Sequence, residues 1–352
     1  MRYFAILTAC AVAGIGLAAA GVITGAAGAK PRPCKVGSGC TTTTVSTSTT
    51  TTTSTSPTTP LPANAAAPRQ LGVTLAWSSS WSSDLVAYSA RVGRVPSVVQ
   101  TYRDMQYAML NPDQMNTVAV MGALPLVTIE PWDSSSTTDP RYTLKNIVRG
   151  DFDAWFRAGA DTARTYGTPF YLRFAPEMNG AWAPWEAGIN GNTPQEYVNA
   201  WRHVHAIFVS AGATNAIWVW SPNVFSTGGK AVDFTPYYPG SDVVDVLGLD
   251  GYNWGSADVW QTWTQVFGNS YVSLCALDPS KPVIIAETAS AEAGGDKAAW
   301  IASAYTREIP TVMPRVKIVV WFDEMKETDW RVESSVSSLG AYRSVATSSN
   351  WG

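Results

Sequence analysis

The sequence is poor in charged residues and histidines, and each shortage excludes a class of function. Only 14% of the 352 residues are charged and the net charge is −3, so the chain has no basic field for binding nucleic acid. The two histidines, His203 and His205, lie in one helical pattern but do not share a helix face. This argues against a histidine metal site or a Ser-His-Asp triad. No P-loop or dinucleotide fingerprint is present. We therefore expect no metal and no other cofactor, and carboxylate chemistry remains.

Cysteine is also scarce, with four residues. Cys10 lies in the N-terminal apolar run, and Cys275 stands alone in a core-like segment. Cys34 and Cys40 flank a short loop and form either a local disulfide in an oxidising compartment or two free thiols. None of these spacings suits zinc.

Residues 1–29 read as a signal peptide. Arg2 supplies the positive charge, residues 5–27 are apolar or small, and residues 27–29 resemble an A-x-A cleavage site. A transmembrane anchor is the alternative, and residues 7–10 resemble a lipoprotein processing box. The many Gly and Ala residues favour cleavage, so we expect no stable membrane insertion afterwards.

Residues 30–69 form a second compositional unit, rich in Thr, Ser and Pro. Residues 41–59 are almost only Thr and Ser, with Pro57, and cannot bury apolar area. Such a segment is typical of a disordered linker in an exported protein. We expect a secreted or extracellular protein, or one held at the cell surface.

Residues 70–352 alternate β-rich runs with helical patterns, which predicts one folded domain. Runs such as Val-Ile-Ile-Ala (283–286) are apolar throughout, which indicates strands buried on both faces of a parallel sheet. A (β/α)8 TIM barrel fits this length, and a doubly wound open sheet is the alternative. The predicted strands are Leu71–Ala76, Ser97–Tyr102, Leu124–Glu130, Pro169–Ala175, Ala216–Trp220, Val243–Asp250, Pro282–Glu287 and Val316–Phe322. The clearest helical patterns are Asp151–Tyr166, Thr193–Ala211 and Asp296–Glu308.

Carboxylates and aromatic residues follow the predicted strands. In a TIM barrel the carboxyl ends of the strands form the active site. Glu177 and Glu287 end strands four and seven, and a pair of carboxylates delivered in this way is what glycoside hydrolysis requires. The other strand ends carry Glu130, Asn223, Tyr252, Trp254 and Trp321, which is the lining expected of a polysaccharide cleft.

Arg173 is expected inside the barrel. Because side chains alternate along a strand, Arg173, Ala175 and Glu177 are predicted to point the same way. A buried guanidinium requires acceptors, and Glu287 is one candidate partner. Such a cation would keep that carboxylate ionised. A structural ion pair elsewhere in the barrel is the alternative.

Three motifs resemble glycoside hydrolase family 26. They are Arg173-Phe-Ala-Pro-Glu-Met-Asn-Gly-Ala-Trp-Ala-Pro-Trp185, the helical stretch Tyr197–Phe208, and Trp218-Val-Trp-Ser-Pro-Asn223. The resemblance covers about residues 70–345. It implies a retaining glycosidase on a (β/α)8 barrel, of the β-mannanase, β-1,3-1,4-glucanase or β-1,3-xylanase type.

The resemblance also implies roles for individual residues. Glu177 matches the general acid/base, Glu287 the nucleophile, and Tyr252 the tyrosine that hydrogen-bonds the nucleophile. Trp321 matches the aromatic floor under the sugar, while Trp182 and Trp185 lie in a loop that borders the cleft.

The sequence departs from the family pattern at two positions. The family usually has His before the acid/base glutamate, whereas this chain has Pro176. Mannanases tend to carry a Trp-His pair after strand three, whereas this chain has Glu130-Pro131-Trp132, as in the glucanase-like members.

The function expected from the sequence is a secreted, monomeric retaining endo-β-glycanase. Its substrate would be a β-linked polysaccharide, of the β-1,4-mannan or β-1,3-1,4-glucan type, cleaved by double displacement with the two carboxyl groups about 5–5.5 Å apart. The alternatives are a non-catalytic cell-surface polysaccharide-binding protein on the same barrel, and a structural wall protein.

Overall fold

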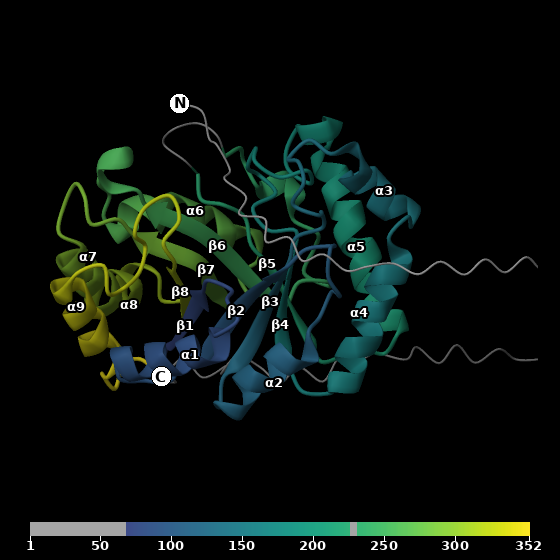
Figure 1. Ribbon diagram of the computed structural model, residues 1–352. Coiled ribbons are helices and arrows are strands. Elements are labelled where there is room, and N and C mark those ends of the chain that lie inside the picture. The colour runs from purple at the N-terminus through teal and green to yellow at the C-terminus, as the bar shows by residue number, and fades with distance from the viewer. Residues whose placement is uncertain (1–67, 226–230) are drawn as a thin grey trace, which may run out of the picture. The chain divides into compact units, whose positions relative to one another are not determined.

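Eight parallel strands close into a barrel in the computed structural model, which describes residues 68–225 and 231–352. The strands pair in chain order, and β1 closes the barrel against β8 (Figure 1). Their bounds are β1 Gln70–Leu75, β2 Val98–Arg103, β3 Leu124–Ile129, β4 Phe170–Phe174, β5 Ala216–Trp220, β6 Val246–Asn253, β7 Val283–Ser290 and β8 Val316–Asp323. The predicted TIM barrel is therefore confirmed, and the doubly wound alternative is wrong.

The helices surround the barrel, with α3, α4 and α5 on one side and α7, α8 and α9 on the other (Figure 1). Thr193 caps α5 through a capping box with Glu196, and Gly212 follows the helix at a φ of 72°. The helix bounds are α1 Trp81–Val92, α2 Pro112–Val120, α3 Leu144–Arg149, α4 Asp153–Tyr166, α5 Pro194–Ser210, α6 Trp263–Leu277, α7 Lys297–Ser303, α8 Ile309–Val312 and α9 Val336–Ala346. The predicted helix 296–308 is α7 continued by a π-helical segment, Ala304–Glu308.

Apolar side chains fill two separate layers. A small cluster lies inside the barrel and includes Val98, Leu126, Ile284 and Val320. A much larger cluster packs the outer faces of the strands against the helices. Because both faces of each strand are covered, the continuous apolar runs of the sequence are explained.

Several predictions fall on residues outside the described ranges. These are the signal peptide 1–29, nearly all of the linker 30–69, and the Cys34–Cys40 pair, so the proposed domain boundaries remain predictions. None of the helices in the described ranges is both long and apolar enough to cross a bilayer.

Candidate active site

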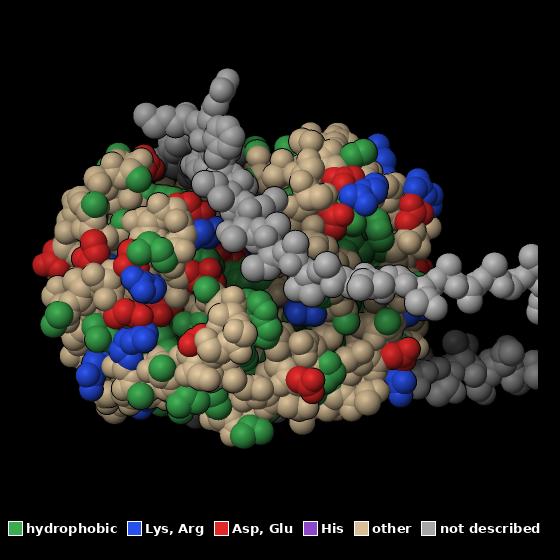
Figure 2. Space-filling view, viewed as in Figure 1, with side chains coloured by type: hydrophobic (Ala, Val, Ile, Leu, Met, Phe, Trp, Pro, Cys, Tyr) green, Lys and Arg blue, Asp and Glu red, His purple; other side chains and the backbone are tan. Residues whose placement is uncertain are grey.

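Because all strands are parallel, their carboxyl ends lie at one end of the barrel, and the predicted site residues come from that end. Glu130 follows β3, Glu177 follows β4 and Asn223 follows β5. Tyr252 lies near the end of β6, and Glu287 lies in β7. Seen from one side, the surface of the barrel carries interspersed charges of both signs rather than a single-sign patch (Figure 2).

Arg173 is fully buried inside the barrel and bonds two carboxylates. Its Nη2 donates to Oε1 of Glu287, and its Nη1 donates to Oδ1 of Asp250 at 3.0 Å. Ser221 donates to the other oxygen of Asp250 at 2.8 Å. The predicted partner Glu287 is present, and Asp250 is an additional partner that the sequence argument did not assign.

The carboxyl group of Glu287 is held as an anion. Burial opposes its ionisation, but the charge and hydrogen bond of Arg173 outweigh burial and lower the pKa of Glu287. The hydroxyls of Tyr102 and Tyr252 lower this pKa further, and Tyr252 donates to Oε2 at 2.8 Å. One cation compensates only one of two acids, and burial raises the pKa of Asp250 instead. The pKa of Glu287 is thus lowered, while that of Asp250, which bonds the same guanidinium, is raised.

The pKa of Glu177 is shifted in the opposite direction to that of Glu287. Burial, and then the negative charge of Glu287, raise its pKa to about 7. Two donors restrain this rise: Asn223 Nδ2 bonds Oε1 at 2.5 Å, and Trp182 Nε1 bonds Oε2 at 2.9 Å. The site thus contains one carboxyl group that keeps its proton near neutral pH and another that has lost it.

The backbone at Glu177 is strained. Ala175 and Glu177 have φ values of 45° and 55°, a region that L-residues seldom occupy. The strand ends at Phe174. The prediction that the side chains of Arg173, Ala175 and Glu177 alternate along one strand and point the same way is therefore wrong for Glu177. Such strain is typical of functional sites, where surrounding contacts hold the residue in place.

Buried polar contacts hold the two donors to Glu177. Asn179 accepts from the backbone of Asn223 at 2.9 Å and donates to its carbonyl oxygen at 2.9 Å. The backbone N–H of Trp182 donates to buried Glu186. The indole of Trp182 packs on Gly180, where an added Cβ would lie 2.5 Å from the ring. Asn179 and Glu186 are supporting residues that the sequence argument did not identify.

Two predicted tryptophans do not face the mouth of the barrel. Trp321 is fully buried, packs against Trp300 and Tyr342 at 6.2 and 5.5 Å, and donates to the carbonyl oxygen of Trp330. The predicted floor role of Trp321 is therefore wrong. Phe322, the next residue, points the other way and contacts Tyr252 edge-on at 5.9 Å.

Trp185 is also buried, at 2% exposure, and its Nε1 donates to the carbonyl oxygen of Pro176. It supports the loop beneath Glu177 and does not offer a face to a ligand, which corrects its predicted binding role. Trp182 remains 38% exposed. Trp254 is half-buried and packs against Tyr252 and Trp330.

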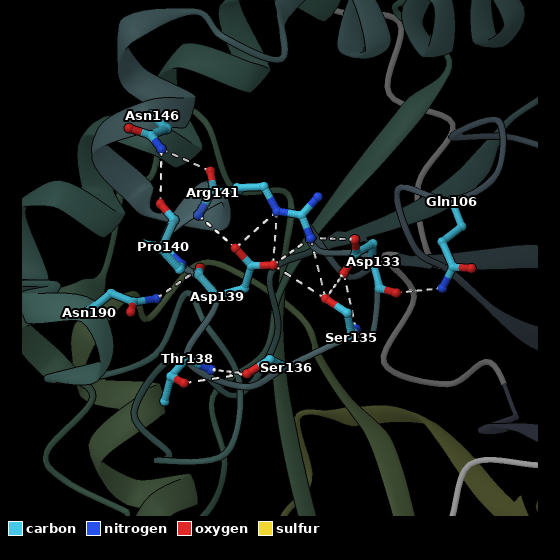
Figure 3. A network of polar contacts seen from close by, with 10 residues as sticks. All are labelled: Gln106, Asp133, Ser135, Ser136, Thr138, Asp139, Pro140, Arg141, Asn146 and Asn190. Carbon is cyan, nitrogen blue, oxygen red and sulfur yellow. Dashed lines mark hydrogen bonds and ion pairs between the residues drawn. The ribbon is translucent and has the colours of Figure 1, made fainter.

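Glu130 stands in the loop after β3, and burial followed by the charge of Glu287 raises its pKa to about 7. A polar network fixes this loop (Figure 3). Arg141 bonds Asp133 and Asp139 within it, Gln106 of the β2 loop donates to the carbonyl oxygen of Asp133, and Asn190 of the β4 loop donates to that of Asp139. Glu130 is thus presented by a loop that is tied to both neighbouring loops.

Comparison with known proteins agrees with this geometry. The profile of glycosyl hydrolase family 26 matches residues 111–307, more than half of the chain. The chain belongs to glycosyl hydrolase family 26. The family predicted from the three motifs is confirmed.

Curated relatives of this family 26 chain carry several activities in their names. Endoglucanase H of Acetivibrio thermocellus is 41% identical over 237 residues, which are 65% of this chain and 25% of that protein. Beta-1,3-xylanase TXYA of a Vibrio species is 25% identical over 51% of this chain and 39% of its own length. Mannan endo-1,4-beta-mannosidase of Bacillus subtilis is 27% identical over 47% of this chain and 42% of its own length. The chain thus spans less than half the length of these relatives.

Solved structures support the fold. A family 26 β-mannanase from Bacteroides ovatus superimposes with a TM-score of 0.61 at 16% identity, covering 81% of this chain and 90% of that one. The mannanase of Bacillus subtilis superimposes with a TM-score of 0.59 at 18% identity, covering 83% of this chain and 88% of that one.

Proposed function

We propose that this chain is a retaining endo-β-glycanase. The observation that carries the proposal is the opposite tuning of two carboxyl groups at one site: the pKa of Glu177 is raised to about 7 and that of Glu287 is lowered. A general acid must hold its proton and a nucleophile must have lost it. Membership of family 26 supports O-glycosyl bonds as the target.

The proposed reaction is a double displacement. The ionised Glu287 attacks the anomeric carbon while Glu177 protonates the departing glycosidic oxygen, leaving a glycosyl-enzyme ester. Glu177, now ionised, removes a proton from water, which attacks the same carbon and releases Glu287. Tyr252 holds Glu287 in position through its 2.8 Å hydrogen bond, and Arg173 stabilises the anion before and after the covalent stage.

Mixed-linkage β-1,3-1,4-glucan is the substrate that we favour over mannan. Glu130-Pro131-Trp132 stands where the mannanases of the family tend to have a Trp-His pair, and the carboxyl group of Glu130 can exchange hydrogen bonds with sugar hydroxyls. The 41% identity to a protein named Endoglucanase H supports the same choice. We further propose that residues 1–29 direct export, so that the folded part acts outside the cell. We also propose that it acts as a monomer.

The experiment is product analysis on mixed-linkage glucan, β-1,4-mannan and β-1,3-xylan, with Glu287→Ala as the control. The proposal expects oligosaccharides from glucan, a first product with the β-configuration by proton NMR, and no product from the variant. Hydrolysis by neither protein, with binding of glucan retained, would support instead a non-catalytic polysaccharide-binding protein. Pro176, in place of the family's usual His, is the feature that favours that second reading.

A further inference from the structure

Exposed aromatic side chains of the described residues gather at one end of the barrel. Trp77, Tyr107 and Trp182 are 66%, 60% and 38% exposed, and they lie in the loops after β1, β2 and β4. The other exposed large hydrophobic residues in residues 68–225 and 231–352 are valines and Met325, which itself follows β8. Aromatic exposure therefore occurs at the same end as the two carboxyl groups, which is unexpected for a surface shaped by solvation alone.

Trp77 is the most exposed of these residues, and it stands next to a turn that is held by hydrogen bonds. Its ring lies 5.7 Å from that of buried Trp81, at an angle of 40°. Ser78 and Ser80 both donate to Oδ2 of Asp84, at 2.8 and 2.9 Å, and the N–H of Trp81 donates to the carbonyl oxygen of Ser78. A rigid aromatic face loses little conformational entropy when a ligand covers it.

Trp77 lies on the Glu287 side of the mouth. The strand order runs from β7 through β8 to β1, and Leu75 at the end of β1 is in register with Asp323 of β8. Two interstrand steps separate β7 from β1, or roughly 10 Å along the barrel wall. Trp77 follows Leu75 by two residues, and β1 is two steps from β7 but three steps from β4, so in strand order Trp77 is nearer to Glu287 than to Glu177. Trp182, in contrast, bonds Glu177 from the β4 side.

We propose that Trp77 forms a distal sugar-binding subsite for the part of a β-glycan chain that extends from the unit attacked by Glu287 toward the non-reducing end. The inference rests on the proposed hydrolase function. In the first step Glu287 forms a bond to the anomeric carbon of one sugar unit. That unit and the glycan attached to its non-reducing end stay on the enzyme, while the rest of the glycan leaves. An uncharged chain of β-linked hexoses suits the position, because the C–H faces of pyranose rings stack on indole.

The test uses the full chain and compares Trp77→Ala with Trp77→Phe, which keeps a flat ring, and with Val120→Ala, which alters an 88% exposed side chain of α2. Steady-state kinetics are measured on soluble mixed-linkage β-glucan and on a short aryl β-disaccharide. Trp77→Ala is expected to lower kcat/KM on the polymer about tenfold, mostly through KM, which is the scale of one lost aromatic contact. The disaccharide should be hydrolysed at the wild-type rate, Trp77→Phe should retain most of the polymer activity, and Val120→Ala should be indistinguishable from wild type.

Equal kcat/KM values of wild type and Trp77→Ala on the polymer, or equal losses on polymer and disaccharide, would overturn the subsite and leave the hydrolase function intact. If the wild type hydrolyses none of the glycans, the proposed function fails, and electrophoresis through gels that contain β-glucan tests the subsite separately. Retardation that is lost in Trp77→Ala supports the subsite, whereas retardation equal to that of wild type, or absent in both, overturns it.

Discussion

Arg173 and Glu287 form an ion pair inside the barrel. The guanidinium is fully buried, and its Nη1 bonds the side chain of Asp250. The pair connects the folded core with the proposed chemistry. A buried cation keeps Glu287 ionised, and the ionised Glu287 in turn helps to keep Glu177 protonated. The protonation states of both proposed catalytic groups thus depend on one arginine.

Replacing Arg173 by Met should therefore affect stability and chemistry together. Leaving two buried acids without their cation is expected to cost about 3–5 kcal/mol of unfolding free energy, measured by urea denaturation at pH 7. In the fraction that folds, the pKa of Glu287 rises, so the acidic limb of the kcat/KM profile should move to higher pH. Arg202→Met is the matched control, because Arg202 pairs with Asp242 at the surface and such a pair contributes about 0–1 kcal/mol. Equal losses in the two variants would contradict the role assigned to Arg173.

The pH profile of the wild type should be bell-shaped. Glu177 must be protonated to act as an acid, and its pKa is about 7, so kcat/KM should fall as the pH rises through about 7. Glu287 must be ionised, and its pKa is lowered, so activity should also fall at acid pH, below the ordinary range of a glutamate. Initial rates in buffers of constant ionic strength measure both limbs. A profile that stays flat well above pH 7 would exclude Glu177 as the acid.

Trp182→Phe should move the alkaline limb upward. The indole N–H stabilises the anion of Glu177, and its loss raises the pKa of that carboxyl by about one unit, given about 1.4 kcal/mol per unit. Trp185→Phe serves as the control, because it removes an indole N–H from the same loop that bonds the carbonyl oxygen of Pro176 instead. That variant should be less stable but keep the alkaline limb of the wild type.

Glu177→Gln and Glu287→Gln should differ in their dependence on the leaving group. Loss of the general acid is expected to lower kcat on polysaccharide by about 10²–10⁴-fold. An aryl glycoside with a good leaving group needs no proton in the first step, so Glu177→Gln should retain much of its kcat/KM toward that substrate. Its kcat should still fall, because Glu177 no longer activates the water of the second step. Glu287→Gln should be inactive on both. Parallel losses on both substrates in Glu177→Gln would argue against its assignment as the acid.

Glu130→Gln tests substrate choice. The substitution keeps the size of the side chain and replaces its carboxyl group by an amide, so kcat/KM on mixed-linkage glucan should drop by roughly tenfold, the scale of one lost hydrogen bond. Thermal unfolding should change little, because the polar network around Arg141 that fixes the loop remains intact. An unchanged ratio of rates on glucan and mannan would remove Glu130 from the determinants of specificity.

Much of the barrel could be predicted from the sequence, because both faces of its strands are covered and their runs are apolar throughout. The predicted strand 216–220 agrees with the structure, and each of the others differs by one to three residues at one or both ends. The same continuous apolarity hides which face each residue occupies. Trp321 is predicted at the mouth from its place at a strand end and from the family resemblance, but it faces the helices and Phe322 takes the inner position. Register shifts between β7 and β8 make it harder still to infer which residues of these strands face inward and which face the helices.

The site could be predicted where a charge stands in an apolar run, as for Arg173, or where a carboxylate ends a predicted strand, as for Glu177 and Glu287, although β4 ends at Phe174 and β7 continues to Ser290. Tyr102 and Asp250 were not assigned, since an aromatic or acidic residue near a strand end has many possible roles. Only the closed barrel brings β2, β6 and β7 around the same carboxylate.

The most direct test of the account is to trap the covalent intermediate. The wild type is incubated with a 2-deoxy-2-fluoro β-glycoside that has a good leaving group, digested, and mapped by peptide mass spectrometry. The account predicts a stable glycosyl ester on Glu287, with Glu287→Ala unlabelled. A label on another carboxylate, or an unlabelled enzyme that releases products of inverted configuration, would contradict it.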